Sequence, residues 1–155
     1  MGYGVVECQG ASRVAYVECG VITASARAPR PERLCEIGRG LRELLAELRP
    51  DAVAMEEAFH GVNVQSALAL GEARGVAILV AAEHGVTITG YPPATVKKAV
   101  VGHGRASKQQ IGFLVRALLA MRRTPEPDAA DALAIAICHA RRAPRRQSGS
   151  TGRRA

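Results

Sequence analysis

Thr124–Arg142, TPEPDAADALAIAICHARR, lies near the end of the 155-residue chain and has the clearest pattern in the sequence. Two prolines followed by an aspartate predict a helix start, because proline and acidic side chains both favour the first helical turn. From Asp128 onward the segment is rich in Ala, Leu and Ile, with no Lys or Arg before Arg141. It therefore predicts an apolar helix that opens on two carboxylates, Asp128 and Asp131.

These two aspartates have a structural and a functional interpretation. As residues of the first turns, they can cap the helix and interact with the positive end of its dipole. However, positions 128, 131, 135 and 138 share one helical face, which Ile and Cys continue as an apolar face directed at the protein body. A carboxylate directed inward is costly unless it is paired or binds a cation. The helix thus predicts either a capped start or part of a divalent-metal site.

A third carboxylate, Glu56, ends the short apolar run DAVAME at residues 51–56. The length of this run, and its position after a predicted helix, predict a buried parallel strand. In open α/β sheets, ligands gather beyond the carboxyl ends of such strands. Glu57 is expected to point to the opposite face as a solvated acid. Glu56 together with the two aspartates indicates a hard-metal site of the kind that hydrolyses phosphodiesters.

Outward from these segments, the chain predicts an α/β sandwich with a mixed sheet. Three short strand patterns come first and predict an antiparallel meander. Helices and strands then alternate, and Asn63 is expected to cap the long helix that begins at Val64. The predicted strands are 2–7, 13–20, 20–25, 51–57 and 86–91, and the predicted helices are 31–50, 64–83, 92–102, 108–120 and the closing stretch.

Composition limits the class of protein. Hydrophobic residues make up 48% of the chain, which is enough for the core of one domain. No apolar run approaches the roughly 20 residues of a membrane span, and the start does not resemble a signal peptide, so we expect a cytoplasmic protein. The four cysteines form no C-x-x-C pair and are expected to be buried or half-buried rather than zinc ligands. The lack of G-x-G-x-x-G and P-loop motifs disfavours a metabolic α/β enzyme.

The net charge of +7 is unevenly distributed along the chain. Residues 141–155 hold six arginines and no acid, whereas residues 1–140 hold 15 basic and 14 acidic side chains. We therefore predict a folded domain over 1–140 and a basic disordered tail over 141–155. The tail either attracts phosphate or serves solubility alone.

Basic and aromatic residues lie between the acids in the sequence. The loop VVGHGRAS, residues 100–107, is flanked by cations that predict a phosphate clamp, with ordinary surface charge as the alternative. Phe59 follows Glu56 by three residues, and it either stacks on a base or anchors its loop on the core. The predicted clamp residues are Lys97, Lys98, Arg105 and Lys108.

Several of these segments, in this order, resemble the RuvC family of Holliday junction resolvases. GYGVVE resembles the second half of the family's first motif, AMEEAFHGVNVQSALALGEARGVAI its central block, TVKKAVVGHGRASKQQI its basic loop, and PDAADALAIAICHA its acidic signature. The resemblance runs from Gly2 to about Ala140. It implies an RNase H-like fold, with a mixed five-stranded sheet flanked by helices, and a homodimer. We expect the 64–83 helix, with Gly71 and Gly75 on one face, to form the dimer surface.

The resemblance also implies an activity and its site residues. Family members cut four-way DNA junctions in recombination and DNA repair, use Mg²⁺ held by four acids (Mn²⁺ is an alternative metal), and act with RuvA and RuvB. Glu56, Asp128 and Asp131 match three of these catalytic, metal-binding acids. Lys97 and Lys108 match catalytic lysines that handle the scissile phosphate, and Phe59 matches the aromatic residue that stacks at the junction. The implied DNA-contacting residues are Phe59, Arg74, Lys97, Lys98, Arg105 and Lys108.

One part of the family pattern is absent from this sequence. The family opens with a central strand that ends in Asp-Pro-Gly and supplies the fourth acid, whereas Met1 here directly precedes Gly2. Without that strand, both of its neighbours in the sheet would leave backbone groups unpaired. We expect either that the protein starts upstream of Met1, which we favour, or that the chain is a truncation without nuclease activity. The rivals to a resolvase are a junction-binding module without catalysis and an RNase H-like nuclease with another substrate.

Overall fold

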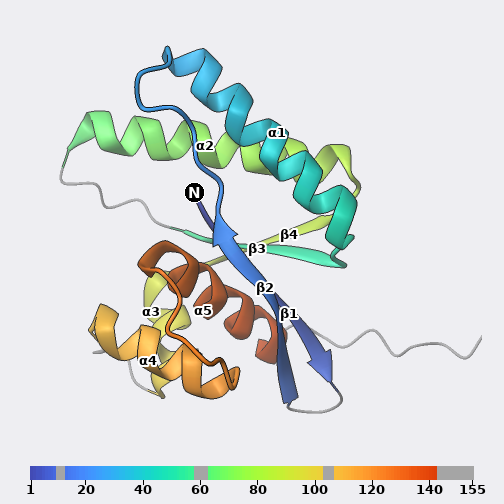
Figure 1. The fold of residues 1–155 in the computed structure, drawn as a ribbon, viewed down its shortest axis with the longest axis vertical. Coiled ribbons are helices and arrows are strands. Elements are labelled where there is room, and N and C mark those ends of the chain that lie inside the picture. Colours follow the sequence, from blue (N-terminus) through green and yellow to red (C-terminus); the bar gives the residue numbers. More distant parts are fainter. Residues whose placement is uncertain (10–12, 58–62, 103–106, 143–155) are drawn as a thin grey trace, which may run out of the picture.

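The computed structural model describes residues 1–9, 13–57, 63–102 and 107–142, which form an α/β fold. Helices α1 and α2 lie together on one side of β3 and β4, and α3, α4 and α5 lie on the other (Figure 1). The elements are β1 (Gly2–Gln9), β2 (Arg13–Val21), α1 (Arg30–Leu48), β3 (Ala52–Glu56), α2 (Val64–Glu83), β4 (Thr87–Tyr91), α3 (Pro93–Val101), α4 (Lys108–Leu118) and α5 (Pro127–Arg142).

The four described strands form two separate pairs. β1 and β2 are antiparallel, with Gly2 opposite Val21, and β3 and β4 are parallel, with Glu56 beside Tyr91. No hydrogen bonds between described residues join β1 to β3. The predicted five-stranded mixed sheet is therefore described as two separate strand pairs rather than as one sheet.

The predicted strand over residues 20–25 is wrong. Ile22 exchanges two backbone hydrogen bonds of 2.8 Å with Met1, which extends the β1–β2 pairing by one residue pair. Beyond Ile22 the chain leaves the sheet and turns toward α1, where the backbone nitrogen of Ser25 donates to the Glu36 carboxylate at 2.7 Å. The meander consequently has two described strands rather than three.

Helix α5 packs closely against β1, and two glycines make this approach feasible. A Cβ atom on Gly4 would lie only 2.6 Å from Cγ of Leu133, and one on Gly2 would collide with the backbone carbonyl of Asp128. Leu133 is fully buried in the larger of two apolar clusters, which joins α3, α4 and α5 to the tip of β4. The close contact fixes the start of α5 beside the start of β1.

Successive residues of β3 face the two sides of the strand pair, as the pleat requires. Ala54 packs on the larger cluster beneath α5, and Val53 packs on a smaller cluster with α1 and α2. The expectation of buried strand residues holds only in part, because Ala52–Met55 are half-buried.

The prediction that all four cysteines are buried or half-buried is wrong for two of them, which are exposed. Cys138 is buried and Cys19 half-buried, whereas Cys8 and Cys35 are exposed.

The expectation that no apolar run approaches the length of a membrane span is wrong for helix α2. It has 20 residues and a mean hydropathy of 1.4, so it passes that test by length and composition alone. In the structure, Glu72 of this helix forms an ion pair with Arg30, and Arg74 donates to the carbonyl of Glu56. Asn63 caps the helix as predicted, accepting from the Gln65 nitrogen at 2.9 Å. These contacts attach α2 to the rest of the domain.

Candidate functional site

Glu56 is the last residue of β3, and its side chain is exposed. It lies in register with Tyr91 of β4, and laterally paired residues of parallel strands face the same side. Since Tyr91 packs in the cluster beneath α3 and α5, Glu56 is on the α5 side of the pair. The Glu57 side chain covers Gly90, on the opposite side. The prediction that Glu57 faces away from Glu56 is thus confirmed.

The two aspartates lie at the start of α5, where the sequence predicts them. Asp128 is in the first turn and exposed, and Asp131 is half-buried. The prediction that both point inward is therefore wrong for Asp128. The reason is that the buried stripe of α5 is centred one residue away from the predicted face, so that Asp131 lies at its margin. The buried residues are Ala129, Ala130, Leu133, Ala134, Ile137 and Cys138.

Glu56, Asp128 and Asp131 are not gathered into one cluster. Within the described ranges, no three His, Cys, Asp or Glu side chains lie close enough together to hold a metal ion. β1, on which α5 packs, is not hydrogen-bonded to β3 within the described residues. Among the described residues, α5 is therefore positioned over β3 and β4 by side-chain contacts and not by a strand-to-strand ladder from β1.

The predicted phosphate clamp is described only in part. Lys97 and Lys98 lie on α3, the first half-buried and the second exposed, next to α5. Lys108 is the first residue of α4, whose start is fixed by a capping box between Ser107 and Gln110. The side chain of Lys108 lies outside the described part of the chain, as do Arg105 and Phe59.

Arg74 has a contact that the sequence does not reveal. The sequence predicts it as a DNA contact, and in the structure its half-buried guanidinium donates to the backbone carbonyl of Glu56. A guanidinium has five N–H donors, so this bond leaves others for a phosphate. This hydrogen bond joins α2 to Glu56, the last residue of β3.

A second contact missed by sequence reasoning joins the tip of β4 to α5. The Tyr91 hydroxyl and Nδ1 of His139 lie 2.9 Å apart, and the two rings meet edge to face with centroids 5.8 Å apart. Burial raises the pKa of Tyr91 and lowers the pKa of His139. Both groups are therefore neutral at pH 7, and their bond holds α5 against the strand next to Glu56.

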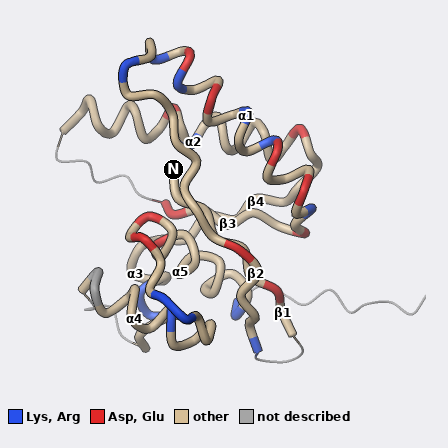
Figure 2. Tube along the Cα trace, viewed as in Figure 1, with Lys and Arg blue, Asp and Glu red and all other residues tan. Residues whose placement is uncertain are grey.

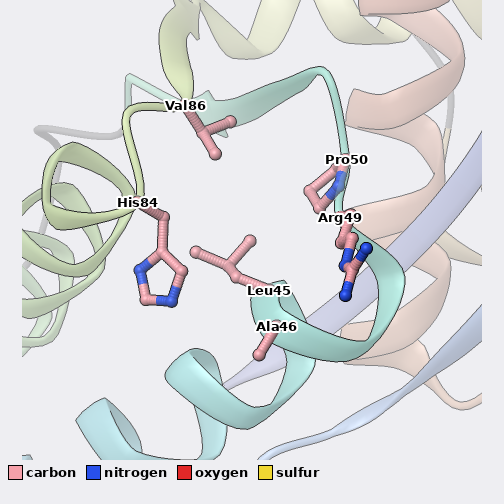
Figure 3. Close-up of a pocket in the computed structure, with 6 residues that line it drawn as sticks. All are labelled: Leu45, Ala46, Arg49, Pro50, His84 and Val86. Carbon is pink, nitrogen blue, oxygen red and sulfur yellow. The ribbon is translucent and has the colours of Figure 1, made fainter.

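A surface hollow of about 370 Å³ lies away from these residues (Figure 3). Pro50 and Val86 line it just before β3 and β4 begin, so it is at the opposite end of the strands from Glu56. It has no acidic side chain, and it is therefore not the candidate site. Its lining residues are Leu45, Ala46, Arg49, Pro50, His84 and Val86.

Comparison with known proteins gives one consistent result. Residues 1–139 match the family model of the crossover junction endodeoxyribonuclease RuvC. RuvC of Chloroflexus aggregans is 49% identical over 93% of this chain and 88% of its own length, and that of Rubrobacter xylanophilus is 48% identical over 98% and 84%. A Thermus thermophilus RuvC structure aligns with a TM-score of 0.81 at 37% identity, covering 90% of this chain and 86% of that one. The same protein in complex with a Holliday junction substrate aligns with a TM-score of 0.84 at 38% identity, covering 90% and 85%.

Proposed function

Because this chain belongs to the crossover junction endodeoxyribonuclease RuvC family, we propose that it resolves four-way DNA junctions by metal-dependent hydrolysis of phosphodiester bonds. The observation that carries the proposal is the arrangement of its acids. Glu56 ends a strand, Asp128 and Asp131 open the helix that covers the same side, and α3, which carries Lys97 and Lys98, packs against that helix. Ends of strands and starts of helices are common positions for sites that act on phosphate.

The acids are the proposed ligands of Mg²⁺. Their donor atoms are carboxylate oxygens, which suit a small hard cation such as Mg²⁺ or Mn²⁺. When bound, such a metal activates water and stabilises the leaving oxygen. Glu56, Asp128 and Asp131 would hold it, and neutralising their mutual repulsion would favour the approach of α5 to the tip of β3. Glu56 and Asp128 are exposed and therefore accessible to water and substrate, whereas Asp131 is half-buried.

The cations have the complementary role of binding the phosphodiester. Lys97 and Lys108 are proposed to offset the charge that builds on the scissile phosphate, while Lys98 and Arg105 bind neighbouring phosphates. Arg74 would hold the Glu56 backbone and offer its remaining donors to DNA. Phe59 is proposed to stack on a base at the junction. The arginines of residues 141–155 would add affinity that is independent of base sequence.

We also propose that the active form is a homodimer built on α2. One face of this helix is apolar and exposed along its whole length, with Val64 77% exposed. The two glycines at its centre meet nothing within 4 Å, so a second helix could come close there. An apolar stripe of this extent typically marks a protein interface. The face comprises Val64, Leu68, Gly71, Gly75, Ile78, Leu79 and Ala82.

The proposed cellular role follows from the proposed chemistry. A cytoplasmic junction resolvase of this family would act in recombination and DNA repair, after RuvA and RuvB have moved the junction. Binding of the purified chain to a RuvA–RuvB–junction complex, compared with the junction alone, would test this partnership.

Substrate choice is the experiment that tests the proposed function. The chain is incubated in Mg²⁺ with a four-way junction and with linear duplexes that contain the same strands. We expect paired cuts in opposite strands of the junction and no comparable cutting of the duplexes. Equal cutting of both substrates would indicate a nuclease of another specificity, and junction binding without cutting at any Mg²⁺ concentration would indicate a binding module.

A further inference from the structure

Positive charge in the domain is concentrated on one region, residues 93–126, which we call the basic lobe. It carries seven Lys and Arg and one acid, Glu126, whereas residues 1–92 carry eight basic and eleven acidic residues. Four of the seven cations belong to the proposed phosphate clamp, and the other three lie along α4 and the turn that follows it (Figure 2). These three are Arg116, Arg122 and Arg123.

The geometry of α4 presents these arginines together with aromatic rings. The Arg116 guanidinium lies 5.3 Å from the ring centroid of Phe113, which is 57% exposed. Ala120 then adopts a left-handed conformation with φ of 51°, and the Met121 nitrogen donates to the Arg116 carbonyl at 2.9 Å. This tight turn ends α4 and directs the chain past the hairpin of β1 and β2.

Beyond the turn, Arg122 and Arg123 line an open groove of about 460 Å³ with Tyr16 of β2. Tyr16 is 40% exposed, so its aromatic ring contributes to the surface of the groove. No acidic side chain lines the groove, whose other lining residues are Leu119, Ala120 and Met121. We call this feature the arginine groove.

The arginines of the groove have no acidic partner in the described part of the chain. The two ion pairs found there, Arg30–Glu72 and Arg42–Glu83, both link α1 to α2 on the far side of the molecule. Exposed guanidinium groups without a carboxylate bind phosphate well, because their planar N–H donors match two phosphate oxygens. Neighbouring aromatic rings can stack on bases or sugars of a nucleic acid.

We propose that the arginine groove, extended by Arg116 and Phe113, binds the phosphate backbone of a DNA arm outside the cleavage centre. The inference rests on the proposed function and adds a second contact surface to it. Tyr16 pairs with Val6, which is four residues, or about 13 Å, along β1 from the Gly2 that lies under Asp128, so Tyr16 is well separated from the start of α5. The groove therefore contributes binding without contacting the reacting phosphate.

The test compares two double variants of the full chain with equal loss of charge. Arg122→Ala with Arg123→Ala removes the groove cations, and Arg27→Ala with Arg33→Ala removes two exposed arginines near the start of α1. The dissociation constants for a four-way junction and for a linear duplex are measured without divalent metal over a range of salt concentrations. Thermal unfolding shows whether each variant is folded.

We expect the groove variant to bind both DNAs about tenfold more weakly, with the salt slope reduced by about 1.8 for two lost phosphate contacts. Its single-turnover cutting rate at saturating protein should be unchanged. Arg122→Lys with Arg123→Lys keeps both positive charges and should keep the salt slope. This variant therefore keeps the proposal testable if the alanine variant does not fold. Binding by the groove variant equal to that of the control would overturn the proposal.

The duplex measurement separates this proposal from the proposed function. If the unmodified chain neither prefers nor cuts the junction, resolvase activity is wrong. Weaker duplex binding by the groove variant alone would still support the groove in that case.

Discussion

Helices α5 and α2 are both rich in apolar residues, yet their surroundings differ. Six of the 16 residues of α5 are buried, because this helix lies between β1 and helices α3 and α4. Only Ala77, Val80 and Ala81 are buried among the 20 residues of α2, which contacts α1 and β4 on one side. Apolar composition therefore predicts that a surface will be covered, but not whether the chain itself covers it.

The ends of the two helices differ in the same way. Nδ1 of His139, in the last turn of α5, bonds to the Tyr91 hydroxyl of a distant strand. His84, which follows the last turn of α2, directs Nδ1 at the carbonyl of Val80 in its own helix, 2.8 Å away. Helix α5 is thus joined to a core strand at its end, whereas the end of α2 is joined to the neighbouring helix α1 through the exposed Arg42–Glu83 ion pair. The exposed face of α2 is the surface that we propose a second copy covers.

The largest effect on folding is expected from truncating α5 in the core. Leu133→Ala removes a fully buried side chain that packs against Gly4, and it should lower the free energy of unfolding by about 2–5 kcal/mol. Urea denaturation measures this change. The comparable substitution Leu118→Ala, at an exposed position of α4, should cost much less. Equal losses would show that α5 is not the centre of the core.

The next effect concerns association through α2 rather than folding. Leu68→Glu with Leu79→Glu places two charges on the exposed apolar face and should raise the dimer dissociation constant at least about 100-fold. Sedimentation velocity at several concentrations measures the change. Leu118→Glu places a charge on an exposed leucine of α4 and should leave the dimer intact. A dimer that persists in the α2 variant would contradict the proposed interface.

A smaller effect is expected where α5 is tied to β4. Tyr91→Phe keeps the buried ring but removes the hydroxyl that bonds to His139, and it should cost about 1 kcal/mol of stability. Tyr16→Phe is the control, because among the described residues the exposed Tyr16 hydroxyl has one hydrogen-bond partner, the Cys19 sulfur at 3.7 Å. Thermal unfolding of both variants measures the two losses of stability. An equal, negligible loss would show that the Tyr91–His139 hydrogen bond does not stabilise the attachment of α5 to β4.

The smallest effect is a pH dependence at the same contact. Burial lowers the pKa of His139 in the folded chain, so the unfolded chain binds its proton more readily. The stability due to the neutral ring is therefore complete above about pH 6.5 and is lost as the pH falls through the lower folded-state value. His139→Gln should show a shallower loss of stability than the parent between pH 6.5 and 5. Parallel stability curves for the two proteins would contradict this assignment.

Sequence periodicity predicted the helices and the positions of the acids well, because those features are local. The position of Glu56 at the end of a strand, the opposite direction of Glu57 and the cap at Asn63 follow from spacing and residue type. The strand predicted beyond Val21 failed because apolar, β-branched composition does not show where a strand loses its partner.

Periodicity in the sequence cannot predict the tertiary contacts that shape the site. Arg74 on Glu56 and Tyr91 with His139 join residues 18 and 48 positions apart, and no local pattern indicates either pair. The arginine groove also depends on tertiary structure, since Tyr16 and Arg122 meet only after folding. The charge count over residues 93–126 was the available signal for that surface.

One measurement tests the metal-dependent resolvase assignment most directly: single-turnover cutting of a four-way junction in Mg²⁺ by the unmodified chain, Asp128→Asn and Glu126→Gln. Glu126 is an exposed acid two residues before Asp128, so its variant is a matched control. We predict that Asp128→Asn slows cutting at least about 100-fold while binding the junction with unchanged affinity, and that Glu126→Gln cuts normally. Equal cutting by the two variants, or no cutting by any of the three proteins, would contradict the assignment.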